Sequence, residues 1–354
     1  MNDLKKNRKK EIIVISLILL ISFAVGLVVP YAQHLANGRN VEWNYYIGKG
    51  IIVSIVCLVV YLLADKYGTA LYEKNSKAIL YIGTAVLLVF AIFESPLSRI
   101  EITAVSKIIA YVYAVVPFLE IITLCAFTFS LNDIISDDFS LTKVAFVATG
   151  FVMAFLLNNI FKVVLLIVLC ALLIKNIKRK SKNSKASTII VAVLCICLII
   201  YLIYVFGKGL KTLLVEWNSP SFMAYVSRNV WSQAKLFGTM DDLNIVGGSI
   251  SNFSLLWLIS FLGIIPAAII VIALIFLVLQ MLKQGENMET VKPLKNLALI
   301  YFCVRLFLAI LANCGIILVG LMTPIPLVMD TVSGMLCSSC LLGLHNTFLK
   351  NATK

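Results

Sequence analysis

The chain is built from long apolar runs, and this feature limits its possible folds more than any other. The hydrocarbon layer of a bilayer is about 30 Å thick, so a spanning helix needs about 20 mostly apolar residues. Several runs of the 354-residue chain meet that requirement. Hydrophobic residues make up 61% and charged residues 13% of the sequence, whereas a soluble domain carries about 25% charged residues. The sequence therefore predicts an all-α, multi-pass integral membrane protein.

Hydropathy predicts about ten transmembrane helices in a single polytopic domain, residues 1–354. Lysine and arginine favour cytoplasmic loops, and they gather at the N-terminus and in the segments 65–77, 175–187 and 283–295. Both termini are therefore expected in the cytoplasm, with a large outer loop, 208–252, before the eighth span. The expected spans are 12–32, 48–64, 78–93, 103–128, 141–157, 159–175, 188–207, 254–282, 297–319 and 333–349.

The charge and the cysteines argue against several classes of function. The net charge of +13 is concentrated in short loops, as membrane topology requires, so no nucleic-acid partner is expected. The nine cysteines fall in or beside apolar spans, where they behave as small hydrophobes. Cys337 and Cys340 have CxxC spacing without a βαβ context, and two histidines are too few for a zinc cluster. We therefore expect no disulfide framework and no metal site.

The outer loop 208–252 mixes aromatic and charged side chains. Trp217, Tyr225 and Trp231 lie in it among lysine, arginine and aspartate residues. Aromatic rings favour the headgroup depth, where one edge is apolar and the other is wet. The pattern has two interpretations: a loop that lies on the membrane surface, or an amphipathic flap over a lipid headgroup site.

Two short segments carry polar and turn-forming residues between the last apolar runs. SNFSLLWLISFLG begins with Ser251 and Phe253, and LANCGIILVGLMTPIPL holds Asn313, Gly315 and the turn 323–327. Both segments resemble motifs of the SEDS family (the FtsW, RodA and SpoVE proteins), and residues 44–67 resemble its second span more weakly. The ten spans and the large loop before the eighth agree with that family.

The resemblance implies an enzyme that polymerises glycan strands from lipid II. Such a transfer needs a base that takes a proton from the attacking hydroxyl, and cations that hold the diphosphate leaving group. The family's aspartate credited with the base role is replaced here by Asn252. A carboxamide is no useful base near pH 7, and general-base assistance is typically worth about 10²–10⁴-fold in rate. Asp241, Asp242 and Asp330 are the candidate substitutes.

Four further residues are candidates for substrate binding. Arg99 and Lys107 could hold the diphosphate, or could be interfacial anchors whose charged ends reach the headgroups. By resemblance, Thr323 and Pro326 belong to a turn that borders an outward-facing groove, although a simple outer turn explains the prolines nearly as well. No cofactor is expected, with a divalent cation left open.

The sequence thus predicts a divergent SEDS-type protein of the bacterial plasma membrane that faces lipid II and membrane lipids. Its role would lie in peptidoglycan assembly for division, elongation or sporulation. Without the base it would be a weak or inactive glycan polymerase, and whether it is an enzyme stays open. A single-span transpeptidase partner is implied by the resemblance alone. Two alternatives are an active glycosyltransferase with a relocated base, and a flippase or transporter of a lipid-linked saccharide.

Overall fold

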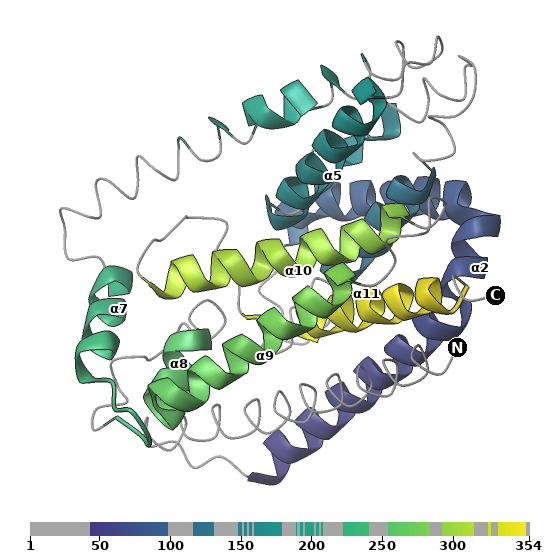
Figure 1. The fold of residues 1–354 in the computed structure, drawn as a ribbon. Coiled ribbons are helices and arrows are strands. Elements are labelled where there is room, and N and C mark those ends of the chain that lie inside the picture. Colours follow the sequence, from purple (N-terminus) through teal and green to yellow (C-terminus); the bar gives the residue numbers. More distant parts are fainter. Residues whose placement is uncertain are drawn as a thin grey trace. The chain divides into compact units, whose positions relative to one another are not determined.

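The computed structural model describes somewhat more than half of the chain, and every regular element in that part is helical (Figure 1). The predicted all-α class is therefore confirmed for the residues that the structure describes. These are 43–97, 116–130, 148–150, 152–153, 156–157, 159–178, helical positions between 189 and 207, 222–240, 254–283, 292–314, 325–326 and 332–351.

Four helical segments within these ranges are long and apolar enough to cross a membrane. They are Ile51–Gly68, Ala70–Ile92, Ile264–Leu282 and Asn296–Asn313. Large apolar side chains also lie exposed along them, for example Ile269 and Ile272 at 61% and 63%. An exposed apolar surface of this kind is costly in water and suits lipid. The helices therefore support a membrane protein, while ten spans and cytoplasmic termini stay predictions, and the expected first span 12–32 lies outside the described residues.

The helix α2, Trp43–Leu97, is 55 residues long and contains two predicted spans, 48–64 and 78–93. The segment 65–77, expected to connect them as a lysine-bearing loop, is helical as well. It contains no proline and is rich in strong helix formers such as alanine, leucine, glutamate and lysine, so its backbone stays helical where its hydropathy falls. At 1.5 Å per residue the 55 residues of α2 amount to about 80 Å of helix. Figure 1 shows that this helix is bent and not straight, so its two apolar parts are separate candidate spans.

Three of the remaining helices lie close to the predicted spans 159–175, 297–319 and 333–349, while a short one lies in the predicted outer loop. The expected eighth span, 254–282, is two helices separated at Gly263, whose φ of +95° only glycine adopts readily. A hydropathy scan cannot detect this break because both sides are equally apolar. The helices are α5 (Asn159–Lys178), α7 (Phe222–Gln233), α8 (Ser254–Leu262), α9 (Ile264–Lys283), α10 (Lys292–Asn313) and α11 (Val332–Asn351); Val116–Ser130 is a shorter apolar helix.

The chain divides into two compact units, described separately below. The first comprises Met1–Val59, Lys208–Glu286 and Phe302–Ser338. The second comprises Val60–Gly207, Asn287–Tyr301 and Ser339–Lys354. The first unit holds α7, α8 and α9, and with them most of the sequence candidates for function.

In the second unit, α2 and α11 cross at small residues. A Cβ atom on Gly343 of α11 would collide with the carbonyl oxygen of Tyr61 and would lie 2.7 Å from the Cβ atom of Ala64, both on α2. The hydroxyl of Thr347 lies 2.8 Å from the carbonyl oxygen of Ala64, and the amide of Asn346 donates to the hydroxyl of Tyr61. Small residues that allow close approach, with polar side chains that bond across, are typical of helix contacts in membranes.

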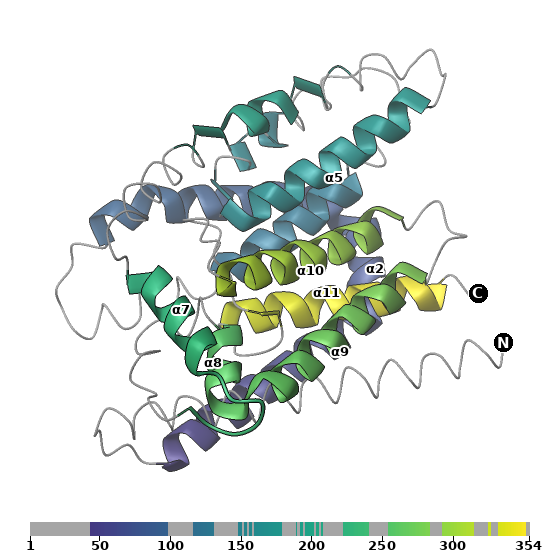
Figure 2. The same cartoon turned by 60° about the vertical axis from the view of Figure 1, so that its left-hand side comes forward.

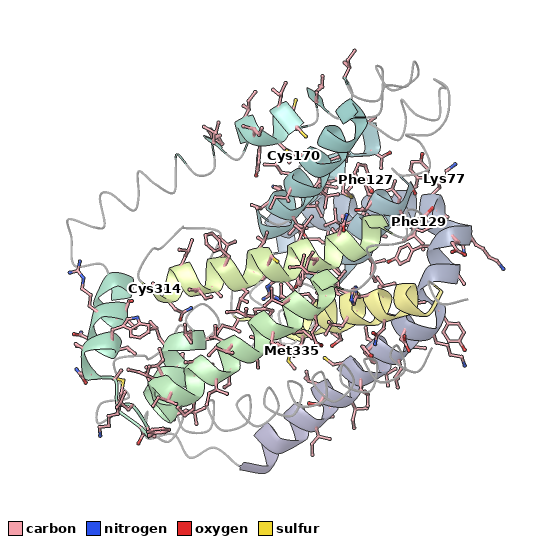
Figure 3. The ribbon with its side chains drawn as sticks, viewed as in Figure 1. Lys77, Phe127, Phe129, Cys170, Cys314 and Met335 are labelled. Carbon is pink, nitrogen blue, oxygen red and sulfur yellow. The ribbon has the colours of Figure 1, made fainter. Side chains whose placement is uncertain are left out.

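The helix Val116–Ser130 packs on the later part of α2 in the same unit. The hydroxyl of Tyr72 donates to the carbonyl oxygen of Ile122 over 3.3 Å, and its ring lies 6.5 Å from that of Phe129. Phe127 and Phe129, labelled in Figure 3, both belong to this helix. The contact therefore holds the charged middle of α2, in which Tyr72 lies, against this helix.

We predict that Gly343→Ala destabilises the protein by about 1–3 kcal/mol, the usual cost of overpacking a tight contact. Thermal unfolding in detergent, followed by the loss of the monodisperse protein peak, measures the effect. Gly207→Ala is the matched control, because a Cβ at that exposed helical position meets nothing within 4 Å. Equal melting temperatures for the two variants would contradict the close crossing.

Candidate functional site

A group of short elements covers one end of α9 and α10, and we call it the cap. It consists of α7, the segment 234–240 and α8. Figures 1 and 2 show α7 and α8 together beside the first turns of α9, with the C-terminal end of α10 next to α7. All of these parts belong to the first compact unit.

Asn313, the last residue of α10, joins three helices at the cap. Its backbone carbonyl oxygen accepts hydrogen bonds from the hydroxyl of Ser227 at 3.2 Å and the indole N–H of Trp231 at 2.9 Å, both on α7. Its side-chain oxygen accepts from the backbone N–H of Leu256 on α8 at 3.0 Å, and its amide nitrogen donates to the carbonyl oxygen of Ala309 at 2.6 Å. Asn313 is fully buried, and the bonds to Ser227, Leu256 and Ala309 are buried as well, whereas the bond from Trp231 is partly exposed.

These bonds satisfy backbone groups at the ends of α8 and α10. The last carbonyl groups and the first N–H groups of a helix have no partners within it. Asparagine commonly caps the helix in which it lies, but here its side chain caps α8 from α10 while α7 supplies donors to its carbonyl. Figure 3 labels the next residue, Cys314, at this end of α10 beside α7. The C-terminal end of α10 is therefore completed by α7, and the N-terminal end of α8 by the side chain of Asn313.

The start of α9 is satisfied in a similar way by the segment 234–240. The backbone N–H groups of Ile264 and Ile265 donate to this segment, Pro266 has no N–H, and Ala267 donates to the carbonyl oxygen of Gly263 at 3.3 Å. The segment runs antiparallel to the α8–α9 junction. The bonds between them are Gly238 N–H to Leu262 O at 3.0 Å, Met240 N–H to Ser260 O at 2.8 Å, Ile264 N–H to Lys235 O at 2.9 Å and Ile265 N–H to Leu236 O at 3.1 Å.

Gly263 permits this pairing. A Cβ atom there would lie 2.7 Å from the carbonyl oxygen of Leu236 and 2.7 Å from the Cα atom of Phe237. Neither backbone atom can move without breaking the hydrogen bonds of the junction. The glycine that ends the apolar sequence of α8 is therefore needed both for its positive φ and for the close approach.

The turn predicted at 323–327 also contacts α8. The backbone N–H of Ile325 donates to the hydroxyl of Ser254, the first residue of α8, over 2.7 Å, and the following Pro326 is buried. With the Leu256–Asn313 bond, this makes two direct contacts between the segments that resemble SEDS motifs. Residues about 60 to 70 positions apart in the sequence thus meet at the N-terminal end of α8.

Only one of the predicted site residues, Pro326, belongs to the described part of the chain. The others lie outside it, although two described residues close to them in sequence, Met240 and Ser254, are buried parts of the cap. The predicted residues outside the described ranges are Arg99, Lys107, Asp241, Asp242, Asn252, Thr323 and Asp330.

The described part of the cap carries cations but no carboxylate. Arg228 and Lys235 are exposed on it, and Trp231 is 40% exposed. The interior is apolar, with Trp257 stacked on Phe261 at a centroid distance of 5.4 Å. Such a surface can bind an anion beside an apolar chain, and a base for proton transfer must come from elsewhere. No group of three or more metal-binding side chains occurs within the described ranges.

Sequence analysis did not identify Ser227 and Trp231 as partners of Asn313. Their spacing of four residues puts both on one face of a helix, and this signal was available in the outer loop. Their shared acceptor, the carbonyl oxygen of Asn313, lies 86 residues after Ser227 and 82 residues after Trp231. No local sequence pattern could identify it.

A second polar feature, in the other unit, is a buried lysine. Lys162 on α5 is 4% exposed, its ammonium donates to the hydroxyl of Tyr201 over 2.8 Å, and it lies 4.2 Å from the centre of that ring. Glu120, on the helix Val116–Ser130 of the same unit, is 3% exposed. Ionisable groups inside apolar helices are expensive and commonly functional.

We predict that Asn313→Ala lowers the free energy of unfolding by about 1–3 kcal/mol, because the N–H of Leu256 then lacks its acceptor in a buried site. Thermal unfolding in detergent measures it. Ser232→Ala is the control, since it removes an exposed hydrogen bond on α7, to the carbonyl oxygen of Asn229. A loss no greater for Asn313→Ala than for Ser232→Ala would contradict the role of Asn313 in holding the cap.

Comparisons of the sequence with protein-family models and with curated proteins found no match. The argument for function therefore rests on the residues of the cap and on the two segments that meet there.

Proposed function

We propose that this chain is a divergent SEDS-type protein of bacterial peptidoglycan assembly, located in the plasma membrane. It would bind a polyprenyl-diphosphate-linked saccharide, lipid II, beside the cap and have weak or no polymerase activity. One observation carries the proposal: the two segments that resemble the family meet at Leu256–Asn313 and Ser254–Ile325. Two unrelated likenesses would have no reason to form one hydrogen-bonded site.

The chemistry of the cap supports a lipid-linked anion as the ligand. The cap lies at the end of two apolar helices, where a diphosphate could stay at headgroup depth while its polyprenyl tail remains in hydrocarbon. Arg228 and Lys235 are exposed cations there, and cations bonded to phosphate oxygens are among the stronger polar contacts. Trp231 adds an aromatic edge of the kind that favours this depth. A single-span transpeptidase is the expected partner, on the family resemblance.

Loss of the base supports weak or absent polymerase activity. Asn252, at the position of the family's aspartate, precedes the first residue of α8 by two positions. The described part of the cap offers no carboxylate in its place. The candidate proton acceptors in its place are Asp241, Asp242 and Asp330.

An active enzyme with a relocated base is favoured by one contact. Met240 is buried, and its N–H is bonded to the carbonyl oxygen of Ser260 at 2.8 Å. Asp241 therefore follows a residue that is fixed against α8. A carboxylate that follows this residue in the chain could act as the base that Asn252 cannot be.

A transporter or flippase of the same lipid is favoured by a different observation. Lys162 and Glu120 are buried within apolar helices of one compact unit. Buried charges of this kind often mark the pathway of a polar substrate through a membrane protein.

We predict that purified wild-type protein binds labelled lipid II but forms little or no glycan polymer. Asn252→Asp should raise polymer formation, up to the roughly 10²–10⁴-fold that a general base supplies. Gel separation of the products measures polymer, and binding of labelled lipid II is measured in parallel. A triple Asp241→Ala, Asp242→Ala, Asp330→Ala variant tests the relocated base.

The outcomes separate the candidates. Wild-type polymer that disappears in the triple variant would establish the active enzyme and overturn the inactive one. Movement of labelled lipid II between leaflets, lost in Lys162→Met but not in Ser232→Ala, would favour transport. Absence of lipid II binding in every variant would contradict the proposal altogether.

A further inference from the structure

Two large apolar side chains project from the segment 234–240 of the cap, which follows α7 and pairs with the α8–α9 junction. Leu236 and Phe237 are adjacent in sequence, and each is 64% exposed. Most of the other strongly exposed large hydrophobics in the described ranges lie on long apolar helices. A leucine and a phenylalanine exposed in a short loop need a different explanation.

The loop is held rigidly despite its exposure. The carbonyl oxygens of Lys235 and Leu236 accept hydrogen bonds from the first two residues of α9, and Gly238 donates to Leu262 on the other side. Gly238 itself has a φ of +86°, which sets the turn after Phe237. Leu236 and Phe237 therefore project from a fixed backbone and cannot fold back into the core.

The same hydrogen bonds set the height of the loop along α9. The apolar segment Ile264–Leu282 has 19 residues, or about 28 Å at 1.5 Å per residue, close to the hydrocarbon thickness of a bilayer. Ile264 therefore lies at one edge of the hydrocarbon when α9 spans it. The Lys235 and Leu236 carbonyls bond to Ile264 and Ile265, so the loop lies at that edge.

The charges beside the loop fit the headgroup layer. Lys235 precedes the apolar pair and is exposed, and Arg228 is exposed on α7. Lysine and arginine at this depth place their charged ends among phosphates while their stems stay in apolar surroundings. Anionic lipids attract such cations further. An apolar tip directly preceded by a lysine at a hydrocarbon edge matches a lipid surface better than a protein one.

We infer that Leu236 and Phe237 insert into the leaflet at the N-terminal end of α9 and anchor the cap to the membrane. Lys235 and Arg228 lie at the phosphates of that leaflet. The inserted side chains would hold the cap, and with it the N-terminal end of α8, at a constant depth. This inference does not depend on lipid II being the ligand, and it holds equally for a protein without enzymatic activity.

Cysteine labelling tests the insertion directly. Phe237→Cys and the matched control Gln233→Cys are placed separately in the full-length protein; both native side chains are exposed, so neither should impair folding. Each variant is reconstituted in nanodiscs of zwitterionic and anionic phospholipids and treated with a water-soluble maleimide. The wild type, treated identically, gives the background from the nine native cysteines.

We expect Phe237→Cys to react on the order of tenfold more slowly than Gln233→Cys, because the thiolate is the reactive form and apolar surroundings suppress it. Unfolding in SDS should make the two rates equal. Equal rates in nanodiscs would overturn the inference.

A second readout distinguishes lipid from protein as the covering partner. Phe237→Cys is labelled with a fluorophore in detergent, reconstituted, and exposed to lipids brominated near the headgroup end of their acyl chains. Strong quenching, absent for the Gln233→Cys label, is the expected result. Slow maleimide labelling without quenching would mean that protein covers the loop, and would overturn insertion into the leaflet.

Discussion

The hydrogen-bond needs of helix ends at the boundary of the hydrocarbon organise the cap. Where water is scarce, each backbone N–H and C=O must find a partner inside the protein. Asn313 meets this need for two helices at once, because its carbonyl accepts from α7 and its side chain accepts from α8. The segment 234–240 does the same for the start of α9. The cap is therefore a means of closing helix ends, and its position follows from the ends that it closes.

A site with these properties suits a ligand that is part lipid and part anion. The apolar interior around Trp257 lies in the same compact unit as two exposed cations, Arg228 of α7 and Lys235. Because Asn313, Leu256 and Ser254 use their polar groups to hold the cap together, they are positioning residues, and proton transfer would need a carboxylate from another part of the chain. Under the proposed SEDS-type function, this division would allow the scaffold to persist with Asn252 at the position of the family's aspartate.

Part of the helical framework could be predicted from the sequence, because the long apolar runs in α2, α9 and α10 have the length and composition of membrane spans. The continuity of α2 could not be predicted in this way. Hydropathy reports how apolar a segment is, whereas the backbone of 65–77 is helical because many of its residues favour a helix. The break at Gly263 was hidden because α8 and α9 are equally apolar. In the site, Asn313 and Pro326 were identified from motif, but the bonds of Asn313 to Ser227 and Trp231 join distant segments. The candidate carboxylates lie outside the described residues, so their roles stay predictions.

The most direct test of the account is hydrogen exchange, measured by mass spectrometry, on wild type and Asn313→Ala in nanodiscs. If Asn313 holds the cap, the variant should lose protection in peptides from both α7 and α8, although neither helix is altered, while α11 keeps its protection. A loss confined to the C-terminal turn of α10, with α7 and α8 unchanged, would contradict the claim that one buried asparagine couples these helices.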